Sequence, residues 1–149
     1  MHRLFQFLDG STGASEDELR EARALLAPAE RALIVDVDAI VQTAVDLWRK
    51  MRLRQDVAAL LATGQRIYEV PFSMRLPRPA TGVTAAQPEV VVLRGTIDCL
   101  VVRPDGSVVV VEFKTGRPRG SHQQQLDVYV DAARLLFPEA SVSGQLIYG

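Results

Sequence analysis

The chain has 149 residues, enough for one domain with a hydrophobic core. Apolar residues make up 48% and charged residues 23%, and the net charge of −1 gives no overall positive field that would point to nucleic acid. The one cysteine, Cys99, excludes a disulfide framework or a four-cysteine metal site within the chain. Neither a signal peptide nor a bilayer-spanning apolar run is seen, so we expect a cytoplasmic protein without membrane contact.

The first part of the chain has the spacing of amphipathic helices. Apolar residues recur at helical intervals over 15–27, and this helix is predicted to end before Pro28. The clearest pattern lies over 37–51, where the apolar residues fall on one helical face. A short helix is predicted over 55–63, and Gly64 suits the position just after its end. This part of the chain is therefore predicted to be helical.

The second part of the chain changes to the alternating pattern of strands. Strands are predicted over 66–76, about 89–103 and 107–114, with a loop rich in proline and glycine between the first two. A helix over 122–136 and a last strand over 141–148 follow. Three strands, a helix and a strand after a helical segment predict an α/β domain with a mixed central β-sheet flanked by helices.

The second and third strands are joined by RPDGS, residues 103–107. Proline, aspartate and glycine in that order are typical of a three-residue hairpin loop closed by a left-handed glycine. With this loop, Asp98 lies directly opposite Glu112, and Lys114 projects from the same face two residues further on. A two-residue turn would instead send Asp98 and Glu112 to opposite faces of the sheet.

Two carboxylates that face each other in buried strands repel one another. A divalent cation would remove that repulsion, since Mg²⁺ takes one or two carboxylates and leaves its other positions to water and phosphate oxygens. A lysine beside them could steady the attacking water or the developing negative charge. The stretch from Asp98 to Lys114 therefore indicates a metal site for cutting a phosphodiester. From these residues alone, an ion pair between the lysine and one carboxylate is an equal alternative.

The ordered motifs GTID, EFKTG and QLDVY resemble those of the PD-(D/E)XK nuclease superfamily. More narrowly, they resemble the nuclease domain at the C-terminus of bacterial RecB- and AddA-type helicase–nucleases. The resemblance implies a restriction-endonuclease-like core in a single domain over 1–149, with a helical part over 1–64 and a sheet core with the active site over 65–149. It also implies that the domain comes from a larger helicase–nuclease chain.

The resemblance implies a role for five residues. Asp98 and Glu112 would hold Mg²⁺ or Mn²⁺, and Lys114 would position the water or stabilise charge. Gln125 and Tyr129, one helical turn apart on one face, would organise the site. Some relatives bind an iron–sulfur cluster through four cysteines, and this chain cannot do so because it has one.

Two further metal ligands are implied by the resemblance. His2 matches a histidine on the first helix of the family, and Glu69 matches an acidic residue on its first strand. The alternatives are a disordered chain end for His2 and a solvated strand face for Glu69.

Three arginines are candidates for contacts with DNA phosphates. Arg117 and Arg119 lie in the loop after the lysine, and Arg94 is placed on the same strand face as Asp98. The alternative for loop arginines is simple solvation. His122, at the start of the following helix, is expected at the surface.

These features predict a divalent-metal-dependent deoxyribonuclease, and the resemblance implies that it is an exonuclease. It would act with the helicase domain of its parent chain, which would deliver single strands of DNA, in the repair and recombination of double-strand breaks. One alternative is an inactive nuclease-fold module used for DNA binding or docking in a repair complex. Another is a metal-free enzyme that uses the two carboxylates as acid and base, in which the lysine is superfluous.

Overall fold

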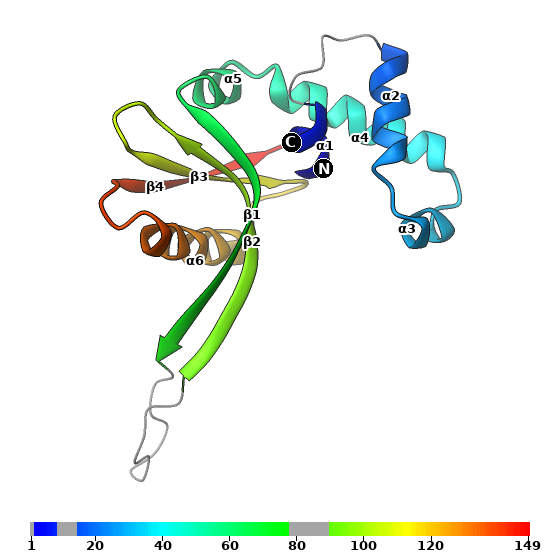
Figure 1. Ribbon diagram of the computed structural model, residues 1–149. Helices are drawn as coiled ribbons and strands as arrows, with labels where there is room; N and C mark the ends of the chain where they lie inside the picture. The colour runs from blue at the N-terminus through cyan, green and yellow to red at the C-terminus, as the bar shows by residue number, and fades with distance from the viewer. Residues whose placement is uncertain (1, 9–14, 78–89) are drawn as a thin grey trace.

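The computed structural model describes residues 2–8, 15–77 and 90–149. Its helices are α1 (His2–Leu8), α2 (Ser15–Ala24), α3 (Pro28–Leu33), α4 (Val37–Arg52), α5 (Gln55–Leu61) and α6 (Gly120–Leu136). Its strands are β1 (Gln65–Pro77), β2 (Val90–Val102), β3 (Val108–Lys114) and β4 (Val142–Tyr148). They form one sheet in the order β1-β2-β3-β4, in which only β3 and β4 are parallel (Figure 1). The predicted mixed sheet flanked by helices is confirmed.

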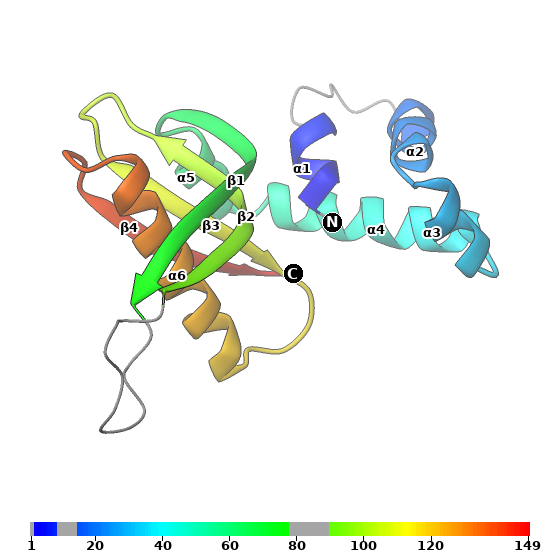
Figure 2. The same cartoon turned by 60° about the horizontal axis from the view of Figure 1, so that its bottom comes forward.

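The sheet has a hydrophobic core on each face. On one face α6 packs Leu126 and Val130 against Leu100 and Val110 of the central strands. On the other face, helices α1, α4 and α5 cover the alternate side chains of the same strands. The helices α2 and α3 lie along the end of α4 that is remote from the sheet (Figure 2). None of the helices in the described ranges is long and apolar enough to cross a membrane.

The helix that begins at Ser15 ends before Pro28, as predicted, but a separate helix that was not predicted then follows. The helix α2 ends at Ala24, and the proline begins a separate short helix, α3. Proline suits the first position of a helix because its missing N–H would have no intrahelical partner there. The side chain of Glu30 accepts the backbone N–H of Ala27 at 2.7 Å, which further stabilises this start.

Gly64 also has a different role from the one predicted. The helix α5 ends at Leu61 with Ala62 as its C-cap, so the glycine does not occupy the position just after the helix. A Cβ atom at Gly64 would lie 2.2 Å from the carbonyl oxygen of Val102. Glycine is therefore required because the start of β1 approaches the backbone at the end of β2.

The hairpin between β2 and β3 has the predicted three-residue loop. Arg103 donates its backbone N–H to the carbonyl of Ser107 at 2.9 Å, and Gly106 donates to the carbonyl of Arg103 at 3.0 Å. Gly106 has a φ of 81°, in the left-handed region. The carboxylate of Asp105 accepts from both the N–H and the hydroxyl of Ser107. Side chain and backbone thus specify the same turn.

The register of this hairpin is the predicted one. The paired residues run from Val102 opposite Val108 to Cys99 opposite Val111. A two-residue turn would have shifted every pair by one residue and reversed the faces of one strand. The alternative register is therefore excluded.

The β1–β2 ribbon changes the face that it presents to the core halfway along its length. Tyr68 packs under the α1–α4 layer, whereas Val70 packs with the α6 core, although residues two apart in a regular strand share a face. On β2, Cys99 and Ile97 differ in the same way. The change falls at Glu69, whose φ of 53° is unusual for a residue other than glycine. The ribbon consequently curves past α6 (Figure 1).

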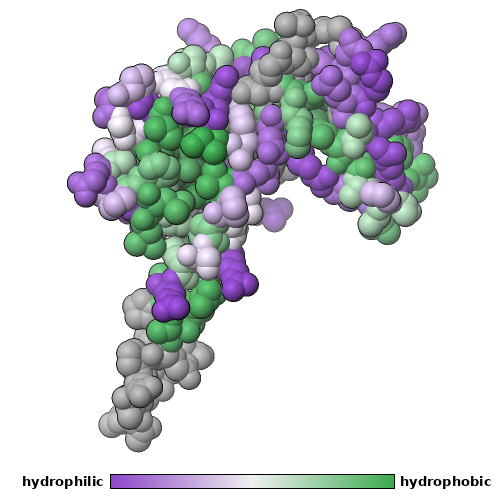
Figure 3. All heavy atoms as spheres, in the orientation of Figure 1, coloured by the Kyte–Doolittle hydropathy of each residue, from purple (hydrophilic) through white to green (hydrophobic). Residues whose placement is uncertain are grey.

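Beyond α6, β1 and β2 form an arm that projects from the sheet. Leu76, Val90, Val91 and Val92 on this arm are at least 39% exposed. Apolar surface accordingly continues down the arm in the space-filling view (Figure 3). The outer part of the arm, which carries these four residues, is therefore held by strand pairing rather than by burial in either core.

Candidate active site

Asp98 and Glu112 lie on adjacent strands and face α6. They continue the rows of Leu100 and Val110, which pack against that helix, and they are only 5% and 1% exposed. The regular pairing of β2 and β3 stops one residue short of Asp98. There the carboxylate of Asp98 accepts the backbone N–H of Phe113 at 2.9 Å. The predicted placement of the two carboxylates side by side on one face is confirmed.

Lys114 connects this acidic pair to α6. Its Nζ donates to Oε1 of Glu112 at 2.6 Å and to Oε1 of Gln125 at 2.7 Å. Gln125 donates its side-chain N–H to the hydroxyl of Tyr129 at 2.8 Å, across one turn of the helix. The lysine side chain is 15% exposed. The structure therefore joins the five residues of the predicted catalytic set into one polar cluster.

Glu112 is subject to opposing influences. The pKa of Glu112 is raised to about 7, chiefly by burial. The hydrogen bond from Lys114 acts in the opposite direction and lowers this pKa, whereas the negative charge of Asp98 raises it further. Its Oε2 atom is buried and has no hydrogen-bond partner among the described residues. Burial also raises the pKa of Tyr129, so that its phenol stays protonated at neutral pH.

The two carboxylates fit a divalent cation. The buried oxygen of Glu112 that no described residue satisfies and the adjoining carboxylate of Asp98 are the hard oxygen donors that Mg²⁺ and Mn²⁺ prefer. A cation at this position would favour the ionised form of Glu112 and offset its repulsion with Asp98. Within the described ranges, no third His, Cys, Asp or Glu gathers with them as a metal-binding group. Two carboxylates would therefore be the protein's share, with water and phosphate oxygens completing the coordination.

The two ligands implied by resemblance alone are not part of this pair. Glu69 lies at the break in the β1–β2 pairing, between Tyr68 opposite Cys99 and Val70 opposite Ile97. It is half-buried and makes no hydrogen bond or ion pair with any described residue. Its left-handed backbone carries a conformational cost of the kind found at functional sites. His2 begins α1, but its side chain lies outside the described residues.

The three predicted DNA-binding arginines are all exposed. Arg117 and Arg119 lie between β3 and α6, close in the chain to Lys114. Arg94 lies on the projecting arm, where its neighbour Leu93 packs against the α6 core, so the arginine points away from that core. The predicted common face of Arg94 and Asp98 is therefore wrong, because the ribbon twists between them.

One pair of residues near the site was not predicted. His122 was expected at the surface, but it is half-buried, and its Nδ1 lies 3.1 Å from the hydroxyl of Tyr148. Tyr148 pairs with Lys114 in the parallel register of β3 and β4, so the two side chains project next to each other. The alternating pattern of β4 does not reveal the contact between His122 and Tyr148. The contact depends on the parallel register of β3 and β4, and these strands are separated in the chain by α6.

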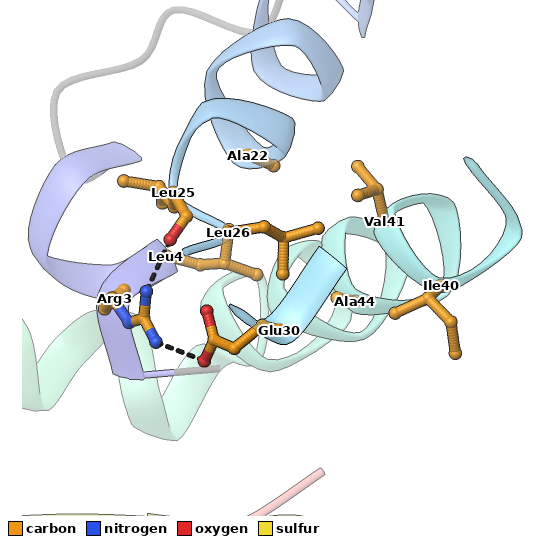
Figure 4. A pocket seen from close by; sticks show the side chains of 9 residues that line it. All are labelled: Arg3, Leu4, Ala22, Leu25, Leu26, Glu30, Ile40, Val41 and Ala44. Carbon is orange, nitrogen blue, oxygen red and sulfur yellow. Dashed lines mark hydrogen bonds and ion pairs between the residues drawn. The ribbon is translucent and has the colours of Figure 1, made fainter. Parts of the chain in front are cut away.

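A pocket in the helical layer lies apart from this cluster. It is bounded by α1, α2, α3 and α4, and the nine residues that line it are labelled in Figure 4. The two charged residues among them, Arg3 and Glu30, pair with each other at 2.5 Å. The remaining lining residues are apolar, so this pocket presents no group suited to catalysis.

Comparison with known proteins gives the family. An ATP-dependent helicase/nuclease protein of Moorella thermoacetica is 33% identical over 151 residues, and the match covers 91% of this chain but 10% of that protein. The crystal structure of SSO0001 matches 99% of this chain and 57% of its own, with 18% identity and a TM-score of 0.41. The family model of the PD-(D/E)XK nuclease superfamily matches residues 1–148, and together with the mixed sheet it confirms the predicted restriction-endonuclease-like α/β fold. The chain belongs to the PD-(D/E)XK nuclease superfamily.

Proposed function

We propose that this chain is a deoxyribonuclease domain that hydrolyses DNA phosphodiester bonds with Mg²⁺ or Mn²⁺. The observation that carries the proposal is the carboxylate of Glu112, which is bonded to Lys114 through one oxygen and has a buried second oxygen without a partner among the described residues. A simple structural ion pair would not require Asp98 beside it, because a second carboxylate adds repulsion.

Asp98 and Glu112 would hold the cation. When bound, a divalent cation supplies Lewis acidity that polarises the phosphate and makes water a better nucleophile at neutral pH. Glu69 and His2 would be further ligands only as the family resemblance implies, because Glu69 does not gather with the two carboxylates into a metal-binding group and the side chain of His2 lies outside the described residues. The protein's part is to hold these oxygens on a rigid hairpin, where their positions do not depend on a loop.

Lys114 would stabilise the negative charge that develops on the phosphate during cleavage. An ammonium group has three donors, and in this protein Glu112 and Gln125 occupy two of them. The third N–H is not used by any described residue, so it is free for the substrate. Since the other two bonds fix the ammonium in place, little reorganisation is needed when the charge appears.

Tyr129 would donate a hydrogen bond to the substrate or to the attacking water. Its hydroxyl accepts from Gln125, which leaves the hydroxyl proton available. The raised pKa of Tyr129 keeps that proton in place at neutral pH. Gln125 thereby orients both Lys114 and Tyr129 through one amide group.

The substrate would be single-stranded DNA supplied by a helicase motor, and the reaction would be exonucleolytic. This part of the proposal is supported by the relative, which is a helicase/nuclease protein of about ten times the length of this chain. Arg117 and Arg119 would contact phosphates next to the site, and Arg94 would do so from the arm. The biological role would be DNA repair and recombination in the cytoplasm.

Cleavage assays on matched linear and circular single-stranded DNA test this function. We expect linear DNA to be degraded with Mg²⁺ or Mn²⁺, and no degradation with a chelator. An exonuclease spares the circular substrate because it has no end, whereas an endonuclease cuts both. Absence of metal-dependent cleavage of either DNA, with and without a helicase joined to the chain, would contradict the proposal.

A second candidate is a nuclease fold retained for DNA binding or docking. It is favoured by the observation that the described residues gather two metal-ligating side chains rather than three. Such a module would bind DNA without cutting it, and its affinity would not depend on a divalent cation. Cleavage that disappears on substitution of Asp98 would exclude it.

A further inference from the structure

His122 and Tyr148 form a polar pair beside the catalytic cluster. Nδ1 of His122 and the hydroxyl of Tyr148 share a hydrogen bond of 3.1 Å, and the two ring centroids are 5.7 Å apart. Both residues are half-buried. His122 precedes Gln125 by three positions on α6, so these two side chains lie on the same helical face. Tyr148 is the strand partner of Lys114. The pair therefore extends the row of polar groups that holds the lysine.

The tyrosine is firmly placed. Arg54 donates to the carbonyl of Tyr148 at 2.5 Å, and Gly149 donates its N–H to the carbonyl of Lys114 at 3.0 Å. A Cβ atom at Gly149 would lie 2.7 Å from Sδ of Met51, which shows how closely β4 approaches α4 at this point. The backbone at the end of β4 is thus held from both sides.

The bond to Tyr148 determines what the histidine can offer a ligand. A tyrosine hydroxyl that donates to Nδ1 leaves the proton of a neutral imidazole on Nε2, and a protonated imidazole also carries a proton there. The Nε2 atom of His122 has no partner among the described residues. In the other neutral tautomer Nδ1–H donates to the tyrosine oxygen and Nε2 is an acceptor. A phosphate oxygen accepts hydrogen bonds only, so it would select the arrangement in which the tyrosine donates and Nε2–H points to the ligand.

The surroundings of this donor favour an anion. The first turn of α6 contains no acidic residue. Arg117 and Arg119 precede it directly in the chain and are exposed, and the ammonium group of Lys114 lies one strand away from Tyr148. A DNA strand carries its negative charge on phosphate oxygens, which accept from such donors.

We propose that His122 binds a backbone phosphate of the DNA substrate through Nε2, and that Tyr148 is the positioning residue that orients it. This inference rests on the proposed nuclease function. It assigns the strand a path from the acidic pair, past Lys114, to the start of α6. The contacted phosphate is next to the one that is cut, so His122 contributes to binding and not to the chemical step.

The test measures DNA affinity and cleavage separately. Affinity for a short single-stranded oligonucleotide is measured by fluorescence anisotropy with Ca²⁺ in place of Mg²⁺, and kcat and KM are measured with Mg²⁺. The variants are His122→Ala, His122→Gln, His122→Asn and Tyr148→Phe. The matched control is Gln124→Ala, on the same turn of α6, because this residue is exposed and makes no hydrogen bond with any described residue.

We expect His122→Ala to weaken DNA affinity by about 3- to 10-fold, the typical net effect of losing one hydrogen bond. KM should rise by a similar factor with kcat nearly unchanged, because the contact is the same before and during cleavage. The amide nitrogen of glutamine reaches about as far as Nε2, so His122→Gln should retain most of the affinity, whereas the shorter His122→Asn should not. Tyr148→Phe should weaken binding less than His122→Ala, and the double variant should resemble His122→Ala alone.

Two results would overturn the inference. One is an affinity of His122→Ala equal to that of Gln124→Ala. The other is an equal loss in His122→Gln and His122→Ala, because the pair would then be needed only for packing. Thermal unfolding identifies variants that do not fold. If His122→Ala is one of them, the affinities of the two single variants His122→Gln and Tyr148→Phe decide whether His122 binds DNA. If the unchanged protein binds DNA with Ca²⁺ but never cuts it, the nuclease proposal fails while the affinity data still test His122.

Discussion

The carboxylate of Asp98 accepts the backbone N–H of Phe113 at the point where β2 and β3 cease to pair. This hydrogen bond takes the place of the next bond in the ladder. It is buried, since Asp98 is 5% and Phe113 is 1% exposed. Asp98 therefore has a structural role in the hairpin in addition to its proposed role as a metal ligand, and the two roles can be separated by substitution.

Asp98→Ala should lower the free energy of unfolding of the metal-free protein by about 1–3 kcal/mol, because the buried N–H of Phe113 loses its acceptor. Asp98→Asn keeps an acceptor oxygen and removes the charge that repels Glu112, so its metal-free stability should match or exceed that of the unchanged protein. Both variants should lose cation binding and cleavage. Urea unfolding with a chelator measures the stabilities, and an alanine variant as stable as the asparagine variant would contradict the structural role.

Lys114→Ala should reduce the single-turnover rate of cleavage by about two to three orders of magnitude, the typical effect of removing one preorganised electrostatic group. DNA affinity should change little, because the charge that the lysine stabilises develops only during the reaction. The control is Lys50→Ala, which removes the chain's other lysine, an exposed one on α4. If affinity and rate fell by the same factor, the lysine would be a binding residue and not a catalytic one.

Glu112 should make the stability of the metal-free protein depend on pH. Its pKa is about 7 in the folded state against 4.5 as the ordinary value, so between these values the folded state binds more protons than the unfolded state. The stabilising contribution is therefore complete below about pH 4.5 and is lost as the pH rises through about 7. Glu112→Gln, which stays neutral, should gain stability relative to the unchanged protein over this range.

Denaturant unfolding of both proteins at about pH 5 and about pH 8, with a chelator present, measures this difference. A difference that does not vary with pH would mean that Glu112 titrates normally. Cation binding requires the ionised carboxylate, so Mg²⁺ affinity should fall as the pH drops below about 7.

Replacing Arg117 and Arg119 together by alanine should weaken DNA binding and flatten its salt dependence. Each phosphate contact contributes roughly 0.7 to the slope of log affinity against log salt for a single strand, so the double variant should lose about 1.4. Arg20→Ala with Arg134→Ala is the control, since these two exposed arginines pair with acidic residues on α2 and α6. Equal slopes for the two double variants would show that the loop arginines are only solvated.

The hairpin that carries the site was predictable because its determinants are local. A proline, an aspartate and a glycine within 103–107 specify the loop, and the loop fixes the register of Asp98 and Glu112. The order and spacing of the family motifs then identified the lysine, and the helical spacing of Gln125 and Tyr129 placed them on one face.

The parts that could not be predicted depend on contacts between distant segments. Nothing in the sequence near Glu69 indicates a left-handed residue, and the resulting twist moves Arg94 away from Asp98. The pairing of Tyr148 with Lys114 is a parallel register across α6, which strand alternation does not determine. His122 was placed at the surface for the same reason, because its partner lies on that last strand.

The turn at 103–107 sets the geometry of the carboxylates from the opposite end of the hairpin. Exposed loop tips are usually the positions where evolution and engineering insert or delete residues without harm. In this hairpin a gain or loss of one residue at the tip would move Asp98 to the opposite face of the sheet from Glu112. The same shift would move every core residue of that strand to the wrong face. Length variation should therefore be excluded at this surface loop as firmly as in the buried core, whereas substitutions that preserve the turn should be tolerated.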